Sequence, residues 1–372
     1  MYVKNLRLIN FRNYSDISID FRNNINVIYG DNAQGKTNLL EALFLCAYGR
    51  SHRTSKDSDL NLYDEQGYFV SVEVENEFTC SSIDVASAKG ERKRVRINKN
   101  PVKRLGELMG NLRAVMFAPE DLMLIKEGPG ERRRFLDMAL SQLRPQYFYD
   151  LQSYLRILTQ RNNLLREMQE NPGIADTLPV WDRALAEKGS KLIIARNAFI
   201  KTLNNKTSVR HTAITENEEA LELEYLPSVK AESLQESGEL TAAFEAALEK
   251  VREREIRTGT TLVGPQRDDL NIFINGKEVK IYGSQGQQRA AALSMKMAEI
   301  DIISEETGET PILLLDDVMS ELDKKRQSYV VDSINGIQTF ITTTDKEIFD
   351  SLEGKDISYA KVIGGTLVWD SV

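Results

Sequence analysis

The stretch Gly30-Asp31-Asn32-Ala33-Gln34-Gly35-Lys36-Thr37 matches the pattern G-x-x-x-x-G-K-[ST], which is typical of a phosphate-binding loop. In such a loop the backbone N–H groups surround the phosphates of ATP, the lysine reaches the β- and γ-phosphates, and the threonine hydroxyl ligates Mg²⁺. The apolar run at residues 25–29 predicts a strand before the loop, and the spacing at residues 39–44 predicts a helix after it. We therefore predict that residues 30–37 bind ATP, that Lys36 is also catalytic, and that Thr37 is a metal ligand.

A second apolar run, Pro311-Ile312-Leu313-Leu314-Leu315, ends in the acids Asp316 and Asp317. This pattern suits a buried parallel strand that presents carboxylates at its carboxyl end. A buried strand that ends in acids is common, but together with a phosphate-binding loop it predicts specific roles. We expect Asp316 to hold Mg²⁺, directly or through water, and Asp317 to orient the attacking water as the catalytic carboxylate.

The composition excludes several classes of protein. A chain of 372 residues buries enough surface on folding to need neither disulfides nor metals for stability. Its two cysteines, Cys46 and Cys80, are expected at core positions of a helix and a strand. No apolar run reaches the ~18 residues of a membrane span, and residues 1–7 lack the apolar core of a signal peptide. We therefore expect a cytoplasmic protein that does not enter the membrane.

Apolar alternation predicts strands near the N-terminus and again in the second half of the chain. The expected strands are residues 3–9, 17–21, 68–74, 95–97 and 221–225. A hairpin is expected where residues 270–274 and 279–281 flank Asn275-Gly276, because this dipeptide suits a type I′ turn.

Helical patterns occupy the middle of the chain. Residues 131–170 and 185–199 carry large apolar residues seven apart, with a break at Asn171-Pro172-Gly173, and residues 239–257 predict another helix. The first two helices form either a short antiparallel arm or two ordinary core helices, since three repeats are few for a coiled coil.

Basic residues crowd one short stretch of an otherwise acidic chain, whose net charge is −8. Those that we expect to contact DNA phosphates are Lys89, Arg92, Lys93, Arg94, Arg96 and Lys99. The alternative is a solvated basic hairpin. Arg132, Arg133 and Arg134 invite the same interpretation, although they could equally pair with neighbouring acids.

The segment Ser284-Gln285-Gly286-Gln287-Gln288 precedes a strongly helical stretch and resembles the signature motif of ABC-type ATPases. In that class the N-terminus of a helix meets the γ-phosphate held by the opposite subunit, where N–H groups and the helix dipole favour an anion. Taken alone, the segment also fits a plain helix capped by Ser284.

The order of the later motifs supports the ABC-type interpretation. Ser320 and Asp323 follow the acidic pair as the D-loop does in this class, and Thr344 lies where the class has its switch residue. We predict an α/β fold, an ABC-type P-loop ATPase head of the SMC/RecF kind, with additional antiparallel strands and an inserted, mostly helical arm. Residues 1–118 and 259–372 are expected to form the two parts of the head, and residues 119–258 the arm or lid.

The whole chain resembles the RecF family of bacterial recombination mediators. Besides the motifs above, the resemblance rests on Leu8-Ile9-Asn10-Phe11-Arg12-Asn13-Tyr14, Pro119-Glu120-Asp121-Leu122, Gly130-Glu131-Arg132-Arg133-Arg134-Phe135-Leu136-Asp137 and Gly264-Pro265-Gln266-Arg267-Asp268-Asp269. It implies that Arg12 touches the nucleotide phosphates, as an arginine of this early turn does in related heads. Gln266 stands where the family usually has a histidine, so the role of this position is open.

The resemblance also implies a function. Such a protein binds ATP and Mg²⁺, forms a homodimer with two nucleotides between P-loops and signature motifs, and clamps double-stranded, gapped or junction DNA. The family acts at single-strand gaps or stalled forks with RecR, and indirectly with RecO and RecA, to promote RecA loading. DNA-stimulated hydrolysis then resets the clamp. We expect it to be slow, because Asp317 is one methylene shorter than the glutamate usual in the class.

Three rival functions fit the chain less well. A transporter-driving ABC ATPase would show neither the arm nor the basic stretch, and an SMC-like tether needs arms hundreds of residues long. A DNA-binding module with an inactive nucleotide site would not need Lys36, Thr37, Asp316 and Asp317 to be intact.

Overall fold

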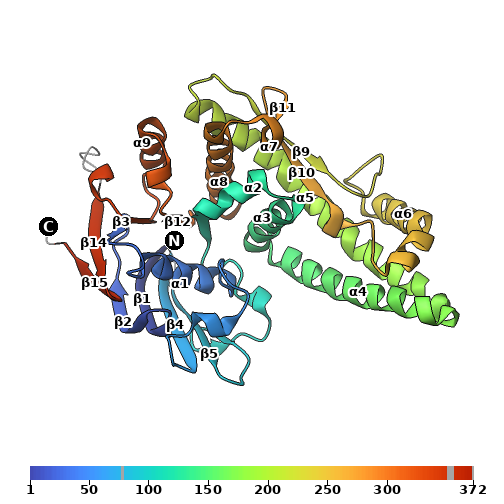
Figure 1. Ribbon diagram of the computed structural model, residues 1–372, viewed down its shortest axis with the longest axis horizontal. Coiled ribbons are helices and arrows are strands. Elements are labelled where there is room, and N and C mark those ends of the chain that lie inside the picture. The colour runs from blue at the N-terminus through green and yellow to red at the C-terminus, as the bar shows by residue number, and fades with distance from the viewer. Residues whose placement is uncertain (77–78, 350–355, 371–372) are drawn as a thin grey trace. The chain divides into compact units, whose positions relative to one another are not determined.

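The computed structural model describes residues 1–76, 79–349 and 356–370 of the chain. The chain divides into two compact units, one formed by Met1–Leu122 with Ala292–Val372 and the other by Met123–Ala291. We call them the head unit and the arm unit, and Figure 1 labels their helices and strands. The predicted α/β class, the added antiparallel strands and the inserted helical arm are confirmed.

A largely parallel sheet forms the centre of the head unit, in the order β15-β14-β3-β13-β12-β8. Its strands are β3 (Ile25–Tyr29), β8 (Ala114–Phe117), β12 (Ile312–Asp316), β13 (Thr339–Thr343), β14 (Ile357–Ile363) and β15 (Thr366–Trp369). All neighbours in this order pair in parallel except β14 and β15. Because parallel strands end at the same edge, the segments after Tyr29, Phe117, Asp316 and Thr343 all leave the sheet on one side.

The second sheet of the head unit is antiparallel, in the order β2-β1-β4-β5-β6-β7. Its strands are β1 (Tyr2–Phe11), β2 (Tyr14–Asp20), β4 (Gly67–Glu75), β5 (Cys80–Ala88), β6 (Arg94–Ile97) and β7 (Asn100–Pro101). One expectation here is wrong: Cys80 is exposed, because it is the first residue of β5 and pairs with Glu75 at the end of the sheet. Cys46 is buried as expected, and burial raises the pKa of its thiol.

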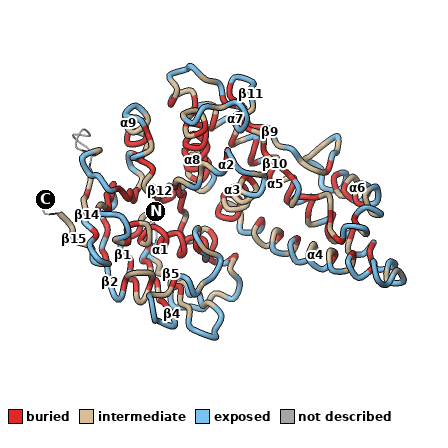
Figure 2. Tube along the Cα trace, in the orientation of Figure 1, coloured by how far each residue is buried: buried red, intermediate tan, exposed pale blue. Residues whose placement is uncertain are grey.

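Helix α1 (Lys36–Tyr48) packs against strands of both sheets and is buried along almost its whole length. Figure 2 shows this burial in α1 and in the central strand β12. The helix ends at Gly49, whose φ of 68° suits glycine and whose N–H donates to Leu45 O. Two further helices belong wholly or partly to the head unit, namely α8 (Gln285–Thr307) and α9 (Lys324–Ser333).

The arm unit contains long helices and a small antiparallel sheet. Its elements are α2 (Met123–Lys126), α3 (Pro129–Leu143), α4 (Pro145–Glu170), α5 (Leu178–Ile214), α6 (Ser237–Thr258), α7 (Val279–Tyr282), β9 (Leu221–Leu226), β10 (Asp269–Ile274) and β11 (Lys277–Glu278). The helical run 131–170 is interrupted at Arg144, because Pro145 starts a new helix. Helix α6 packs against both α4 and α5, so a third helix joins the two that were expected to form the arm.

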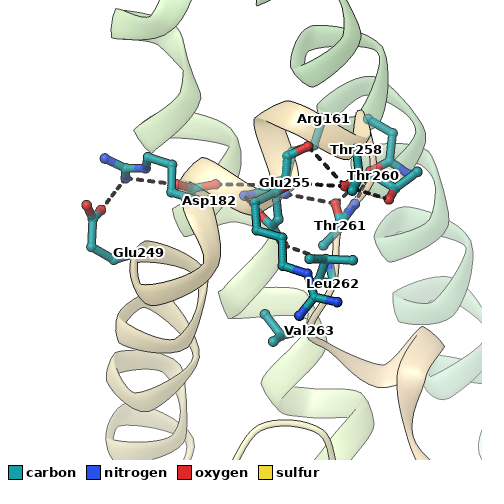
Figure 3. Close-up of polar contacts among 12 residues, drawn as sticks. Arg161, Asp182, Glu249, Glu255, Thr258, Thr260, Thr261, Leu262 and Val263 are labelled. Carbon is teal, nitrogen blue, oxygen red and sulfur yellow. Dashed lines mark hydrogen bonds and ion pairs between the residues drawn. The ribbon is translucent and has the colours of Figure 1, made fainter.

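A buried ionic network joins these three helices (Figure 3). Arg161 of α4 is fully buried, and its Nε donates to Asp182 Oδ1 of α5 over 2.7 Å. Its Nη2 donates to Glu255 Oε2 of α6 over 2.6 Å, and its Nη1 donates to Thr261 Oγ1 over 2.8 Å. Glu255 Oε1 also accepts the backbone N–H of Leu262. Since every donor of a buried arginine needs an acceptor, this network fixes the mutual positions of α4, α5 and α6.

Residues 259–291, which the sequence places with the head, cluster with the arm unit. The reason is that β10 pairs with β9 along its whole length, from Asp269 opposite Leu226 to Ile274 opposite Leu221. The predicted hairpin turn is present, since Asn275 and Gly276 have φ of 50° and 73°. The second predicted strand, residues 279–281, is wrong: Val279–Tyr282 form the helix α7, and the residues that pair with β10 are Lys277–Glu278.

Candidate nucleotide-binding site

The loop between β3 and α1 has the backbone that its glycines predict. Gly30 and Gly35 have φ of 148° and 115°, which disfavour any other residue. A Cβ at Gly30 would lie 2.5 Å from Val362 O, and one at Gly35 would lie 2.5 Å from Asn13 Nδ2. Both glycines are therefore required by conformation and by close packing.

The turn between β1 and β2 supports this loop from one side. Asn13 Nδ2 donates to Gln34 O over 2.7 Å, and Tyr14 Oη donates to Gly35 O over 3.0 Å. Tyr14 is fully buried, and burial raises the pKa of its hydroxyl. The sequence predicts a turn between these two strands, but its contacts with the loop become evident only in the structure.

Lys36 lies at the start of α1 with its ammonium group directed into the loop. Its Nζ donates to Gly30 O over 2.8 Å and to Asp31 O over 3.0 Å, and the side chain is almost fully buried. Neutral carbonyl groups are weaker acceptors for an ammonium than phosphate oxygens are. The Lys36 ammonium group can therefore exchange these carbonyl acceptors for the oxygens of a bound phosphate.

Thr37 and Asp316 come together from α1 and from the end of β12. Thr37 Oγ1 donates to Asp316 Oδ1 over 2.8 Å, and Thr342 Oγ1 donates to the same oxygen over 2.6 Å. Burial raises the pKa of Asp316, and the two hydroxyl hydrogen bonds oppose this shift. A hydroxyl and a carboxylate are oxygen ligands of the kind that Mg²⁺ prefers, so this pair fits the predicted metal site.

Asp317 follows with a backbone φ of 51°, which is uncommon for a residue other than glycine. Its backbone N–H donates to Thr342 Oγ1 over 3.0 Å, and Ser320 Oγ donates to its carbonyl over 2.8 Å. This conformation separates the directions of the two acids: Asp316 contacts Thr37, whereas Asp317 lines the cavity beside the loop.

That cavity has a volume of about 530 Å³. The predicted residues that line it are Arg12, Asn32, Ala33, Gly35, Lys36, Thr37 and Asp317. The lining residues that the sequence did not indicate are Asn13, Asn38, Arg53, Asp59, Asn61 and Tyr63. The other loop residues shape the cavity indirectly: the carbonyls of Gly30 and Asp31 hold Lys36, and Gln34 Oε1 accepts the N–H of Gly364.

Arg12 is held at the cavity by a buried carboxylate. Its Nε and Nη2 donate to Glu41 over 2.8 and 2.6 Å, and its Nη1 donates to Asp59 O over 2.7 Å. Glu41 also accepts from Ser51 Oγ and forms an ion pair with Arg53 over 3.5 Å. Burial alone raises the pKa of Glu41, but these donors and positive charges bring it below its usual value. The negative charge of Glu41 thus keeps two guanidinium groups beside the loop.

The D-loop and switch residues differ in whether they contact other parts of the site. Asp323 is the N-cap of α9, where its side chain accepts from Arg326 N over 3.0 Å. Thr344 is exposed just after β13, and the threonine that contacts the acidic pair is Thr342, two residues earlier. Thr342 lies opposite Asp316 in the parallel pairing of β12 and β13. Its role follows from this register, which the sequence does not reveal.

The signature segment Ser284–Gln288 lies in the arm unit at the start of α8. Ser284 and Gln287 form a reciprocal capping box: Gln287 N donates to Ser284 Oγ over 3.2 Å, and Ser284 N donates to Gln287 Oε1 over 2.9 Å. Gln285 and Gly286 form the first turn between them, and Gln288 Nε2 donates to Gly283 O. The plain capped helix and the signature motif are therefore compatible descriptions of one structure.

The basic residues lie on and between the last strands of the antiparallel sheet. Arg94 and Arg96 point to the exposed side of β6, opposite the buried Val95, and Lys99 is at the tip of the β6–β7 turn. Lys89 and Arg92 are exposed in the preceding turn. Two of the six residues are paired with acids, Lys93 with Asp57 over 2.7 Å and Arg94 with Glu91.

Two other sequence features lie in the interior of the arm unit. Arg132 is buried and donates through Nε and Nη2 to Asp269 over 2.6 and 3.0 Å. Of the two alternatives for this residue, DNA contact and pairing with an acid, the structure shows the second. Gln266 Nε2 donates to Val263 O, and its Oε1 is hydrogen-bonded to Tyr154 Oη. Both hydrogen bonds of Gln266 are therefore to groups within the arm unit.

Comparison with known proteins agrees with this geometry. The model of the RecF/RecN/SMC N terminal domain matches residues 2–360. The DNA replication and repair protein RecF of Acetivibrio thermocellus is 49% identical over 365 residues, which are 98% of this chain and 99% of that protein. RecF of Bacillus cereus is 42% identical over 369 residues, 99% of this chain and 98% of that protein.

Solved structures give the same result. The structure described as the recombination mediator protein RecF-ATP in the RecFOR pathway has a TM-score of 0.93 and 39% identity, and covers 100% of this chain and 98% of its own. An SMC head bound to the C-terminal winged-helix domain of ScpA has a TM-score of 0.57 and 16% identity, over 100% of this chain and 98% of its own, and so shares the fold. Among the described residues, no helix is both long and apolar enough to cross a membrane. The chain therefore belongs to the RecF family of DNA replication and repair proteins, whose members carry an ATP-binding head of the ABC/SMC type.

Proposed function

We propose that this protein is a slow, DNA-stimulated ATPase that dimerises on binding Mg²⁺ and ATP and then clamps DNA. The observation that carries the proposal is the convergence of Lys36 and Thr37, at the start of α1, with Asp316 at the end of β12. Each of these side chains is oriented by hydrogen bonds for a ligand that is rich in phosphate oxygens and carries a divalent cation.

In this proposal the residues have separate tasks. Lys36 exchanges its carbonyl partners for the β- and γ-phosphates, and Arg12, held by Glu41, contacts the phosphates from the β1–β2 turn. Thr37 and Asp316 hold Mg²⁺, which neutralises charge on the phosphates when bound. Asp317 orients the attacking water from the cavity wall. The description of the related RecF-ATP structure supports ATP as the nucleotide.

The second half of the site comes from another copy of the chain. Residues 284–288 begin a helix of 23 residues, whose first N–H groups and dipole favour an anion such as the γ-phosphate. Ser320 and Asp323, in the D-loop, and Thr344, in the switch position, belong to the same proposed dimer interface. A dimer with two nucleotides at this interface makes DNA clamping depend on ATP.

We propose that DNA contacts the exposed basic residues of β6 and of the turns before and after it, foremost Lys89, Arg92, Arg96 and Lys99. The substrates are single-strand gaps, junctions or stalled forks, and the partners are RecR directly, and RecO and RecA indirectly, in the cytoplasm. The RecFOR pathway named for the related structure supports this set of partners.

Sedimentation of the wild type and Ser284→Arg with ATP, with and without gapped duplex, tests the proposal. The wild type should form an ATP-dependent dimer that DNA stabilises. Ser284→Arg should remain a monomer, because the large arginine side chain does not fit against the partner's nucleotide loop. A wild type that stays monomeric with ATP and DNA, or a variant that dimerises as well as the wild type, would contradict the sandwich dimer.

A further inference from the structure

Glu219 contacts the signature motif from a turn that no sequence motif singled out. Its Oε1 accepts a hydrogen bond from Gln287 Nε2 over 2.9 Å. Its Oε2 lies 3.1 Å from Nε2 of His211, which is fully buried in the last turn of α5. The three side chains therefore form a continuous chain of contacts within the arm unit, from the end of its longest described helix to the start of α8.

The backbone around Glu219 is fixed on both sides. Thr215 N and Oγ1 both donate to His211 O, which closes the end of α5. On the other side, Ala220 N donates to Asn275 Oδ1 and Asn275 N donates to Ala220 O, over 2.9 Å each. Glu219 is thus anchored between the helix end and the tip of the β10–β11 hairpin, so its carboxylate has a defined position.

The charge of Glu219 determines how the amide of Gln287 is oriented. A carboxylate only accepts hydrogen bonds, so it faces the NH₂ group of Gln287 and the Nε2–H of His211. With its NH₂ group engaged, Gln287 presents Oε1 to the backbone N–H of Ser284, which is the second half of the capping box. A neutral amide in place of Glu219 can donate as well as accept, so it would also tolerate a flipped Gln287 amide, whose NH₂ group cannot accept from Ser284.

We propose that Glu219, held by His211, is a positioning residue that fixes the Ser284–Gln287 capping box in the conformation that contacts the partner's nucleotide. This inference rests on the proposed ATP-dependent dimer and deepens it. It makes the geometry of the signature motif depend on the end of α5, which is an element of the arm and not of the nucleotide site.

The test uses the full-length protein and the variants Glu219→Ala, Glu219→Gln and Glu218→Ala. Glu218 is an exposed neighbour, so Glu218→Ala is the control for the loss of one negative charge in the same turn. The first measurement is hydrogen exchange of the peptide that covers residues 284–290, without nucleotide. The second is the dissociation constant of the ATP-dependent dimer by sedimentation, with ATP binding to the monomer measured in parallel.

We expect faster exchange of the signature peptide and a dimer about tenfold weaker in Glu219→Ala, as for the loss of a hydrogen bond to a charged group. Glu219→Gln should fall between Glu219→Ala and the wild type, and Glu218→Ala should match the wild type. ATP binding to the monomer should be unchanged. In a Gln287→Ala background, Glu219→Ala should have no further effect on the dimer, because the contact it removes is already absent.

The outcomes separate this inference from the dimer on which it rests. Unchanged exchange in Glu219→Ala overturns the positioning role whatever the dimer does. Faster exchange with an unchanged dimer constant overturns the link to the partner's nucleotide. A wild type that shows no ATP-dependent dimer overturns the proposed function itself and the trans role of the signature with it.

Discussion

Thr342 Oγ1 donates a hydrogen bond of 2.6 Å to Asp316 Oδ1, the oxygen that also accepts from Thr37. Burial raises the pKa of Asp316, and the Thr342 hydroxyl opposes that shift by favouring the carboxylate. Thr342→Val should therefore raise this pKa further and weaken Mg²⁺-dependent ATP binding about tenfold at neutral pH.

The same change should move the pH profile. Asp316 must be ionised to hold a cation, so ATP binding falls as the pH drops through its pKa, and a higher pKa moves this fall to higher pH. Titrations of Mg²⁺-dependent ATP binding between pH 5 and 8 check the shift. Thr343→Val is the matched control, because its hydroxyl is bonded to Asp345 O and not to Asp316. Equal profiles for the two variants would show that Thr342 does not tune Asp316.

Asp317→Asn should leave ATP binding intact, lower the hydrolysis rate about 10²-fold or more, and lengthen the life of the ATP-bound dimer. The reason is that Asp317 lines the cavity, whereas Asp316 is the acid that contacts Thr37. Single-turnover hydrolysis and dimer dissociation after dilution are the measurements. If ATP binding were lost as well, Asp317 would be a metal ligand instead.

Arg161→Met should destabilise the arm unit by about 3–5 kcal/mol, because it leaves the buried Glu255 without its cation and Asp182 with Arg252 alone. Glu255 is fully buried and Asp182 nearly so. Arg183→Met is the control: the side chain is 76% exposed and pairs with Glu187 along the same helix, so its loss should cost less than about 1 kcal/mol. Urea unfolding followed by circular dichroism gives the free energy of unfolding of both variants. A similar loss of stability in the two would mean that the buried network contributes little to the stability of the arm unit.

Glu299→Gln should flatten the pH dependence of stability. Burial raises the pKa of Glu299 to about 7, against the lowering effect of Lys296, whose Nζ lies 3.7 Å away. The folded protein therefore keeps a proton that the unfolded chain loses near its ordinary value of 4.5. The resulting stability is fully present below that value and is lost as the pH rises through about 7.

Between pH 5 and 8 the free energy of unfolding of the wild type should fall by an amount on the order of 3 kcal/mol more than that of Glu299→Gln. Unfolding by urea at both pH values measures the difference. Glu305→Gln, at an exposed position of the same helix, should keep the slope of the wild type. Identical slopes for wild type and Glu299→Gln would mean that Glu299 is ionised in the folded protein.

Lys99→Ala should weaken DNA binding more than Lys93→Ala and should reduce the salt dependence by about 0.9 in log–log slope, as for the loss of one phosphate contact. Lys99 is exposed at a hairpin tip, whereas Lys93 already pairs with Asp57. Fluorescence anisotropy with gapped duplex between 50 and 200 mM salt is the measurement. A larger effect of Lys93→Ala would mean that DNA contacts the surface around Lys93 and Asp57 and not the tip of the hairpin at Lys99.

The sequence predicts contacts within one segment and those between distant segments that both carry a recognised motif, such as Thr37 and Asp316, and it misses the other contacts between distant segments. Gly30 to Thr37 could be predicted because loop, strand and helix are contiguous. Thr342 and Glu219 could not, because one depends on the register between β12 and β13 and the other on a turn beside α8. Cys80 and Val279–Tyr282 show the limit of alternation, since Cys80 is exposed as the first residue of β5 and the β11 pairing stops after two residues.

The parallel sheet also has a consequence for synthesis. β3, which leads into the nucleotide loop, lies between β13 and β14, which are synthesised after the whole arm unit. The arm unit is a continuous segment and can fold earlier, whereas β3 must wait for partners more than 300 residues later in the chain, since Ile25 lies opposite Thr339 and Ile357. A nascent chain therefore completes the sheet around its nucleotide loop only after the arm unit has been made, and ATP binding reports that the two parts of the head have come together.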